Sequence, residues 1–224
     1  MTRETWKSAR FFQLCVLMVL ALLLVPLQLR FQVLWLVLSL LYLGAVMISL
    51  PAGRYRRLRW AFLVGWVLVL VLKLAPVAEP QQATLFYTSS RVLVAVLLGG
   101  CIIATLDYVL RGAEISLDRI FAAIVAYMLA GLGFAAGYQA IVALAPESFA
   151  LPAATGGAGE ELIEVQLIYF SFVTLATLGY GDITPRLPLT QMLAVVEAVV
   201  GQFYVAVVIA WLVSAYAAHR RPGG

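Results

Sequence analysis

Long hydrophobic runs, separated by short polar or basic stretches, make up most of this sequence. A run of 18 or more apolar residues is typical of a helix that crosses a bilayer. Six runs reach about this length: Phe11–Leu29, Val33–Leu50, Trp60–Val77, Val92–Leu110, Ile120–Leu144 and about Leu187–Tyr216. A shorter run, from Leu162 to about Ala176, lies between the last two. The pattern predicts an all-α membrane protein with six transmembrane helices and one shorter, re-entrant helix.

The shorter run is followed by a stretch that breaks the hydrophobic pattern, Thr177-Leu178-Gly179-Tyr180-Gly181-Asp182. Non-helical backbone at membrane depth survives only where it lines a cavity, so this stretch predicts a pore. Glycine at 179 and 181 allows backbone angles that are closed to other residues, so successive carbonyls can face one axis. A file of carbonyls is a cation ligand. The alternative is an ordinary turn between two helices.

This stretch resembles the selectivity filter of potassium channels, in which backbone carbonyls replace the hydration shell of the ion. The resemblance implies potassium sites at the carbonyls of Thr177, Leu178, Gly179 and Tyr180 and at the Thr177 hydroxyl, with Gly181 completing the filter. It also implies a homotetramer, because the family surrounds each ion with two layers of four oxygens. Potassium would be the permeant ligand, and no cofactor is expected. Leu178 replaces the valine that is usual in the family.

Residues near the filter are expected to support it. Tyr169 and Phe170, with Phe172, resemble the aromatic cuff that braces the filter tyrosine in the family, although ordinary core packing is an adequate alternative. Tyr169 is also a possible hydrogen-bond donor to Asp182. Many family members place glutamate or another polar residue where this chain has Val173, so the coupling of that position to the filter aspartate is not expected here. The complete set of supporting candidates is Asp182, Tyr169, Phe170, Val173 and Thr174.

Two residues of the last run are candidates for gating. Gly201 lies twenty residues after Gly181 and matches the hinge glycine of the family's inner helix, but close helix packing explains it equally well. Glu197 lies one turn earlier. A carboxylate this deep in an apolar helix must be paired, protonated or in contact with water. We expect Glu197 to form hydrogen bonds behind the filter, and a cavity-facing carboxylate is the alternative.

Basic residues predict the topology. Arg54, Arg56, Arg57 and Arg59 lie in one short loop, and short basic loops stay in the cytoplasm. The polar stretch from Pro76 to Gln82 carries only acid and amide groups, so we expect it outside. Both termini are then cytoplasmic, and the re-entrant loop enters from outside, in a plasma or inner membrane. The first run has no small-residue cleavage site after it, so we interpret it as a retained helix and not as a signal peptide.

The runs divide the chain into three parts: a four-helix, sensor-like domain (1–110), a cytoplasmic linker (111–119) and a pore domain (120–224). This organisation resembles six-transmembrane tetrameric potassium channels of the prokaryotic type. The fourth helix lacks the arginine series of a voltage sensor, since Arg91 and Arg111 lie at its expected ends. Asp107, one turn before Arg111, is expected to pair with it, although an intramembrane acid is a functional candidate by default. Lys73 is expected to extend to the outer interface.

Smaller features carry weaker expectations. Ser116 or Asp118 can cap the fifth helix, and the spacing of Gly133 and Gly137 allows a neighbouring helix to approach closely. Three acids begin the shorter helix: Glu160, Glu161 and Glu164. They suit a helix N-terminus, and around an oligomer they would also form a negative vestibule that concentrates cations. The sequence leaves these two readings open.

Composition excludes several classes of protein. With 64% hydrophobic and 12% charged residues, the chain is not an ordinary soluble domain. The net charge of +4 comes from arginines at segment ends, so no nucleic acid partner is expected. The lone histidine and scattered acids give no support for an enzyme. The sequence predicts a potassium-selective channel; the alternatives are a weakly selective cation channel, a potassium uptake transporter or a non-conducting membrane subunit.

Overall fold

The computed structural model describes residues 10–31, 37, 39–40, 44, 47, 55–74, 79–111, 116–152 and 159–220. Helices account for nearly all of these residues, which confirms the predicted all-α class. The α-helices are α2 (Arg10–Leu24), α4 (Arg56–Leu74), α5 (Pro80–Arg111), α6 (Leu117–Leu144), α7 (Glu160–Leu175), α8 (Pro188–Phe203) and α9 (Ala210–Arg220). The short elements are two 3₁₀-helices, η1 (Val25–Leu29) and η2 (Pro146–Ser148), the π-helix η3 (Tyr204–Ile209), and the strands β1 (Phe149–Ala150) and β2 (Thr184–Pro185).

Four helical segments of the described residues are long and apolar enough to cross a membrane. They are Arg10–Leu27, Gln81–Arg111, Leu117–Leu144 and Pro188–Ala217. α4, with 19 residues, is long enough but carries arginines in its first turn and Lys73 in its last turn. The second predicted run, Val33–Leu50, lies largely outside the described residues. The chain is therefore a multi-pass helical membrane protein, and the count of six spans stays a prediction.

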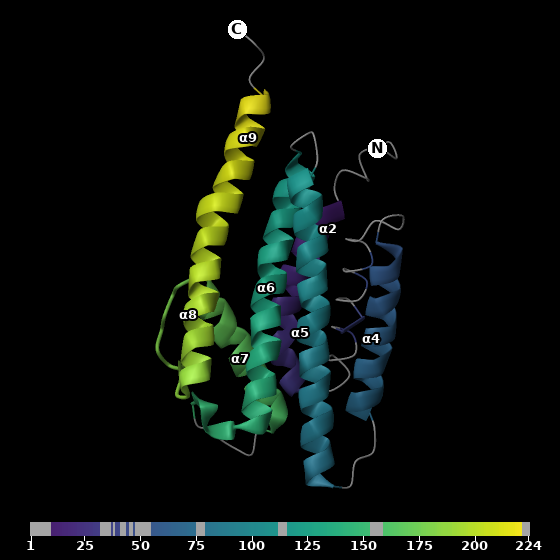
Figure 1. Cartoon of the computed structure of the whole chain (residues 1–224), viewed down its shortest axis with the longest axis vertical. Helices are drawn as coiled ribbons and strands as arrows, with labels where there is room; N and C mark the ends of the chain where they lie inside the picture. Colours follow the sequence, from purple (N-terminus) through teal and green to yellow (C-terminus); the bar gives the residue numbers. More distant parts are fainter. Residues whose placement is uncertain are drawn as a thin grey trace.

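α6 lies at the centre of the arrangement. It packs against α5, α7 and α2, while α4 packs against α5 and α8 packs against α7. Figure 1 shows α5 and α6 side by side along most of their lengths, with α7 and α8 on one side of α6. The N-terminal helices therefore pack beside the C-terminal helices of the same chain, as the short linker 111–119 favours.

α5 is longer than the sequence predicts. It begins at Pro80 and not at Val92, so Gln81 and Gln82 belong to its first turn and the predicted polar loop is wrong from Pro80 onward. Proline suits the first position of a helix, and glutamine is a good helix former. The 32 residues of α5 give a length of about 48 Å, more than the roughly 30 Å of a hydrocarbon core. A helix can therefore continue into polar sequence beyond the apolar layer, which the hydrophobic pattern alone does not reveal.

The polar residues at the start of α6 do not cap it as expected. Ser116 occupies the N-cap position but makes no side-chain capping bond. Asp118 is buried, and its carboxylate accepts a hydrogen bond of 2.9 Å from the backbone N–H of Phe11. The same carboxylate accepts a bond of 3.3 Å from the Tyr108 hydroxyl and lies 3.8 Å from the Arg10 guanidinium. Asp118 thus caps α2, a helix distant in sequence.

The expected pair at the end of α5 is confirmed. The Arg111 guanidinium contacts the Asp107 carboxylate at 2.5 Å, and the Tyr55 hydroxyl donates a hydrogen bond to the same carboxylate. Tyr55 directly precedes α4. Asp107 therefore has a structural role in this fold, since it joins the start of α4 to the end of α5.

Replacing Asp118 by alanine should destabilise the fold. The substitution leaves the Phe11 N–H without its acceptor, and a buried donor without a partner costs about 1–3 kcal/mol. We expect a lower midpoint of thermal unfolding for the detergent-purified protein. Glu147, an exposed carboxylate after α6, provides the matched control, and Glu147→Ala should leave the midpoint unchanged. Equal midpoints for Asp118→Ala and the parent protein would contradict a capping role.

Candidate functional site

The segment that contains α7 leaves one end of the molecule and returns to it. Strand β1 precedes α7, strand β2 follows the Thr177–Asp182 stretch, and the two pair antiparallel with Ala150 opposite Thr184. The backbone N–H of Arg186 adds a bond of 2.8 Å to the Ser148 carbonyl. In Figure 1, α7 extends only part of the way along α6 before the chain turns back toward the start of α8. The pairing of β1 with β2 therefore holds together the two ends of the segment that contains α7.

The backbone of the turn alternates in handedness. Thr177, Gly179 and Gly181 have φ values of 56°, 61° and 77°, whereas Leu178 and Tyr180 do not have positive φ. In an ordinary strand successive carbonyls point to opposite sides. Alternating backbone handedness turns successive peptide groups to the same side, as in backbone nests. The alternation at Gly179 and Gly181 is of the kind that the two glycines predict, and the file of carbonyls stays a prediction.

Thr177 adopts its left-handed conformation although it is β-branched, for which positive φ is a genuine outlier. Three hydrogen bonds hold it. Its N–H donates to the Thr174 carbonyl at 2.9 Å, and the next N–H, of Leu178, donates to the Val173 carbonyl at 2.8 Å. The side-chain amide of Gln202 donates to the Thr177 hydroxyl oxygen at 2.7 Å. Val173 and Thr174 thus support the turn through their backbones.

Gln202 is a site residue that the sequence analysis did not assign. It follows Gly201 in α8, in an otherwise apolar segment. Polar side chains within transmembrane segments mark functional positions often enough that this amide could have been chosen from sequence alone. Its partner, Thr177, could not, because the two residues are 25 positions apart.

Tyr169 contacts the far end of the turn. Its ring stacks on that of Tyr180, with 6.4 Å between centroids, and its hydroxyl donates a bond of 2.8 Å to the Asp182 carboxylate. This hydrogen bond is the one expected from the sequence.

The other cuff aromatics lie elsewhere in this chain. The ring of Phe170 packs edge-on against Tyr138 and Phe149, and Phe172 packs against Gly131. Both therefore hold α7 against α6, and Tyr169 is the aromatic that contacts Tyr180. Sequence could not separate the three, because their directions depend on how α7 is rotated against α6.

The contact between Phe172 and Gly131 also corrects an expectation about glycines. A Cβ atom at Gly131 would lie 3.0 Å from the Phe172 ring, whereas one at Gly133 meets only Leu98 at 3.9 Å and one at Gly137 meets nothing within 4 Å. The close approach of a neighbouring helix is therefore at Gly131. The pair Gly133 and Gly137 does not provide it in the described residues.

Glu197 has no exposed surface. The Tyr138 hydroxyl donates to its carboxylate at 2.8 Å, and the Ser171 hydroxyl contacts it as well. Ser171 also contacts the Gly131 carbonyl at 2.6 Å. Glu197 is thus bonded to α6 and α7, as the first reading of the sequence expected, and in this chain it does not face a cavity.

Gly201 lies against the end of α7. A Cβ atom at this position would come within 2.0 Å of the Leu175 carbonyl oxygen, so only glycine fits. The Tyr127 hydroxyl donates to the same carbonyl at 3.0 Å. The structure therefore accounts for Gly201 by close packing. The π-helix η3 begins three residues later, and the proposed hinge role stays a prediction.

Glu164 does not line a vestibule. It is buried, and its carboxylate lies 2.7 Å from the Arg91 guanidinium and 3.9 Å from the Lys73 ammonium. The Lys73 ammonium, which the sequence predicts to extend to the outer interface, thus lies near Glu164. Arg91, which the sequence predicts at the end of the fourth helix, lies within α5. Glu161 is exposed, and the side chain of Glu160 lies outside the described residues. Of the three acids, Glu164 is therefore not available for a negative vestibule, which was one of the two interpretations that the sequence left open.

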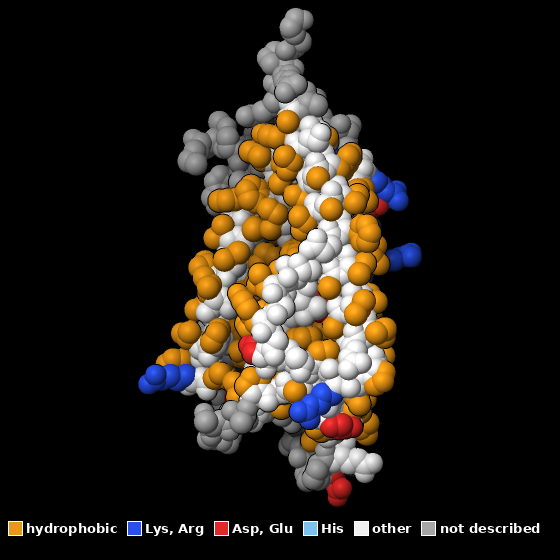
Figure 2. Space-filling model, turned by 90° about the vertical axis from the view of Figure 1, so that its left-hand side faces the viewer, with side chains coloured by type: hydrophobic (Ala, Val, Ile, Leu, Met, Phe, Trp, Pro, Cys, Tyr) orange, Lys and Arg blue, Asp and Glu red, His pale blue; other side chains and the backbone are white. Residues whose placement is uncertain are grey.

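Surfaces around the turn are open in the single chain. Every residue from Ala176 to Asp182 is exposed, including Leu178 and Tyr180 at 57% and 66%. Figure 2 shows hydrophobic side chains over most of the face that carries α8 and α9. Large exposed hydrophobic residues of α8 are Leu189, Met192, Val195, Val199 and Phe203. An apolar surface of this kind is typical of contact with lipid or with further protein chains.

The described residues thus combine apolar helices long enough to cross a membrane with a turn in which the sign of φ alternates. A family model described as "Ion channel" matches residues 160–218, which run from α7 into α9. The chain is also similar to Protein LctB of Geobacillus stearothermophilus, with 32% identity over 124 residues that cover 55% of this chain and 91% of that protein. The chain therefore belongs to the ion channel family. This assignment points to a transport role.

Gly201→Ala should destabilise the protein, because its methyl group would collide with the Leu175 carbonyl. Overpacking of this kind costs about 1–3 kcal/mol. Gly137→Ala is the matched control in a helix, since it meets no atom within 4 Å and should gain up to about 1 kcal/mol from helix propensity. The midpoint of thermal unfolding measures both. A Gly201→Ala protein of normal stability but altered channel opening would favour the hinge over close packing.

Proposed function

We propose that this chain forms a potassium-selective channel and that potassium passes through the pore without its hydration shell. The ions would bind to the carbonyls of Thr177, Leu178, Gly179 and Tyr180 and to the Thr177 hydroxyl. Transport is passive, down the electrochemical gradient, with potassium as the permeant ion. The observation that carries the proposal is the alternating handedness from Thr177 to Gly181.

Four copies of the chain would form this pore. One file of carbonyls surrounds no ion, and the potassium channels that this turn resembles use two layers of four oxygens for each site. The exposure of residues 176–182 and of the apolar face of α8 is consistent with neighbours that cover them. In this arrangement Phe170 and Val173 hold α7 in place, while Tyr169 and Asp182 brace the outer end of the filter.

The proposed channel has six spans, with α7 re-entrant from outside and both termini in the cytoplasm. Arg56, Arg57 and Arg59 at the start of α4 favour this orientation, because short basic segments remain cytoplasmic. Residues 120–224 would then form the pore domain and residues 1–110 the domain beside it. The membrane is the plasma or inner membrane of the cell.

A weakly selective cation channel is the second candidate, and one contact favours it. The Gln202 amide donates a hydrogen bond to the Thr177 hydroxyl oxygen, which is one of the proposed potassium ligands. An oxygen that accepts this bond has fewer lone pairs for an ion. The innermost site would then discriminate less between potassium and sodium.

Potassium flux into liposomes that contain the purified protein tests the proposal, with sodium as the competing ion. We expect flux in potassium at least about tenfold above that in sodium, a difference of about 1.4 kcal/mol between the barriers. Gly179→Ala should abolish the flux, since alanine strains the left-handed conformation at 179. Gly137→Ala, a glycine substitution remote from the turn, serves as the control and should leave the flux intact.

Each other outcome has a clear reading. Equal flux in sodium and potassium would favour the weakly selective channel. No flux in either ion from a correctly assembled protein would favour a non-conducting subunit. Undiminished flux through Gly179→Ala would show that the turn is not the filter.

A further inference from the structure

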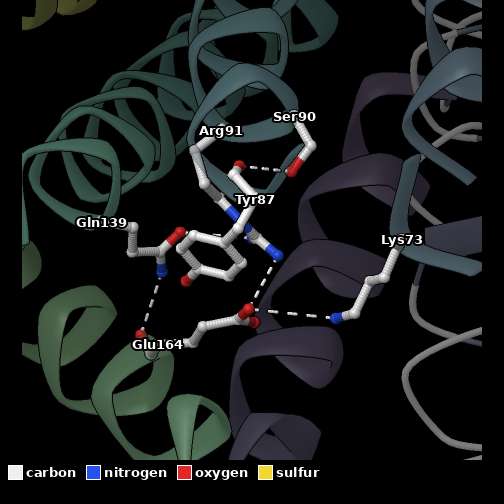
Figure 3. A network of polar contacts seen from close by, with 6 residues as sticks. All are labelled: Lys73, Tyr87, Ser90, Arg91, Gln139 and Glu164. Atoms are coloured by element: carbon white, nitrogen blue, oxygen red, sulfur yellow. Dashed lines mark hydrogen bonds and ion pairs between the residues drawn. The ribbon is translucent and has the colours of Figure 1, made fainter. Parts of the chain in front are cut away.

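A group of polar side chains joins four helices at the start of α7. Figure 3 shows Glu164 of α7 facing Arg91 of α5, with Lys73 of α4 on one side and Gln139 of α6 on the other. The Arg91 guanidinium lies 2.7 Å from the Glu164 carboxylate and donates a bond of 3.3 Å to the Gln139 side-chain oxygen. The Gln139 amide in turn donates a bond of 3.1 Å to the backbone carbonyl of Glu164.

The Arg91 side chain is fixed from a third direction. Its guanidinium lies 4.8 Å from the centroid of the Tyr87 ring, one turn earlier in α5. Stacking on an aromatic ring and a short bond to a carboxylate are both interactions for which arginine is better suited than lysine. Arg91 is therefore held at one position, between its own helix and α7.

The ion pair of Arg91 and Glu164 is largely buried. The side chains of Arg91 and Glu164 are only 13% and 8% exposed. Breaking a buried ion pair by removing one partner leaves an uncompensated charge in a poorly solvated place, which is strongly unfavourable. The pair of Arg111 and Asp107, at the C-terminal end of α5, is less constrained, because the Arg111 side chain is 68% exposed.

We propose that the ion pair of Arg91 with Glu164 positions the pore helix, so that α5 controls through it the fraction of time for which the channel conducts. Glu164 is the fifth residue of α7, and the last residue of α7 lies two positions before Thr177. A helix of 16 residues transmits a tilt from one end to the other. Arg91 is thus a positioning residue for the filter, although it does not touch the permeating ion.

The alternative is that the pair merely stabilises the fold. The two roles differ in what they alter. A positioning contact changes how often the filter conducts while leaving the current through an open channel unchanged. A purely stabilising contact changes the yield and the unfolding temperature, and channels that do assemble behave normally.

Single-channel recording in planar bilayers that contain the full-length protein tests the proposal. We expect Arg91→Gln and Glu164→Gln each to lower the open fraction about tenfold, within the range of couplings measured for residues in contact. The unitary current should stay the same. The double variant should lose no more than either single one, because all three remove the same contact. Arg111→Gln removes the less constrained ion pair from the same helix and should leave the open fraction within about twofold of the parent protein.

Charge reversal provides an independent arm, in case the neutral variants assemble poorly. Arg91→Glu and Glu164→Arg should each lower the open fraction, and together they should restore it at least in part. An unchanged open fraction in either neutral variant, an additive loss in the double variant, or reversal without recovery would overturn the proposal. The recordings use whichever alkali cation the parent protein conducts. Failure of potassium selectivity therefore appears in the reversal potential, separately from the open fraction.

Discussion

The side chain of Glu197 joins the three helices that surround the turn. It lies in α8 and is bonded to Tyr138 of α6 and to Ser171 of α7, with no exposed surface. A buried carboxyl group must have its oxygens satisfied, so these hydroxyls fix the distance and rotation of the helices together. One turn later, Gly201 lets α8 approach the Leu175 carbonyl, where α7 ends. These two contacts therefore determine where the backbone that follows α7 lies.

Polar and apolar side chains therefore have different roles. Hydroxyl, amide and carboxyl groups point inward and fix α7, whereas α8 turns apolar side chains outward. The turn itself is exposed, and its strained Thr177 is held by Thr174 and Gln202. Strained backbone persists only where its surroundings determine it, which suits a segment that must present its carbonyls before an ion arrives. A single chain has the preformed turn but no closed pore, so assembly is part of the proposed function.

The N-terminal helices contribute to the same arrangement without the arginine series of a voltage sensor. α5 packs along α6 and reaches α7 through Arg91. α2 is capped by Asp118 of α6, which secures its start against the same helix. The N-terminal helices α2 and α5 are thus connected to α6 and α7 by a few buried polar contacts. Glu164 gives α5 a direct, buried contact with α7, beside the indirect connection through α6.

The sequence by itself determined the helical class, the positions of most helices and the turn with its two glycines. These follow from local properties. One is the length of each hydrophobic run, such as the run that ends with α6 at Leu144, and another is the freedom of Gly179 and Gly181 to adopt positive φ. Local properties also fell short, since they placed the start of α5 at Val92, where its apolar part begins. Only the tertiary structure decided that Thr177 is left-handed and that Glu164 pairs with Arg91, because each depends on the approach of residues distant in the chain. The partner of a buried polar group depends on which residues lie next to it in the folded chain. Helical spacing along one segment does not predict that partner.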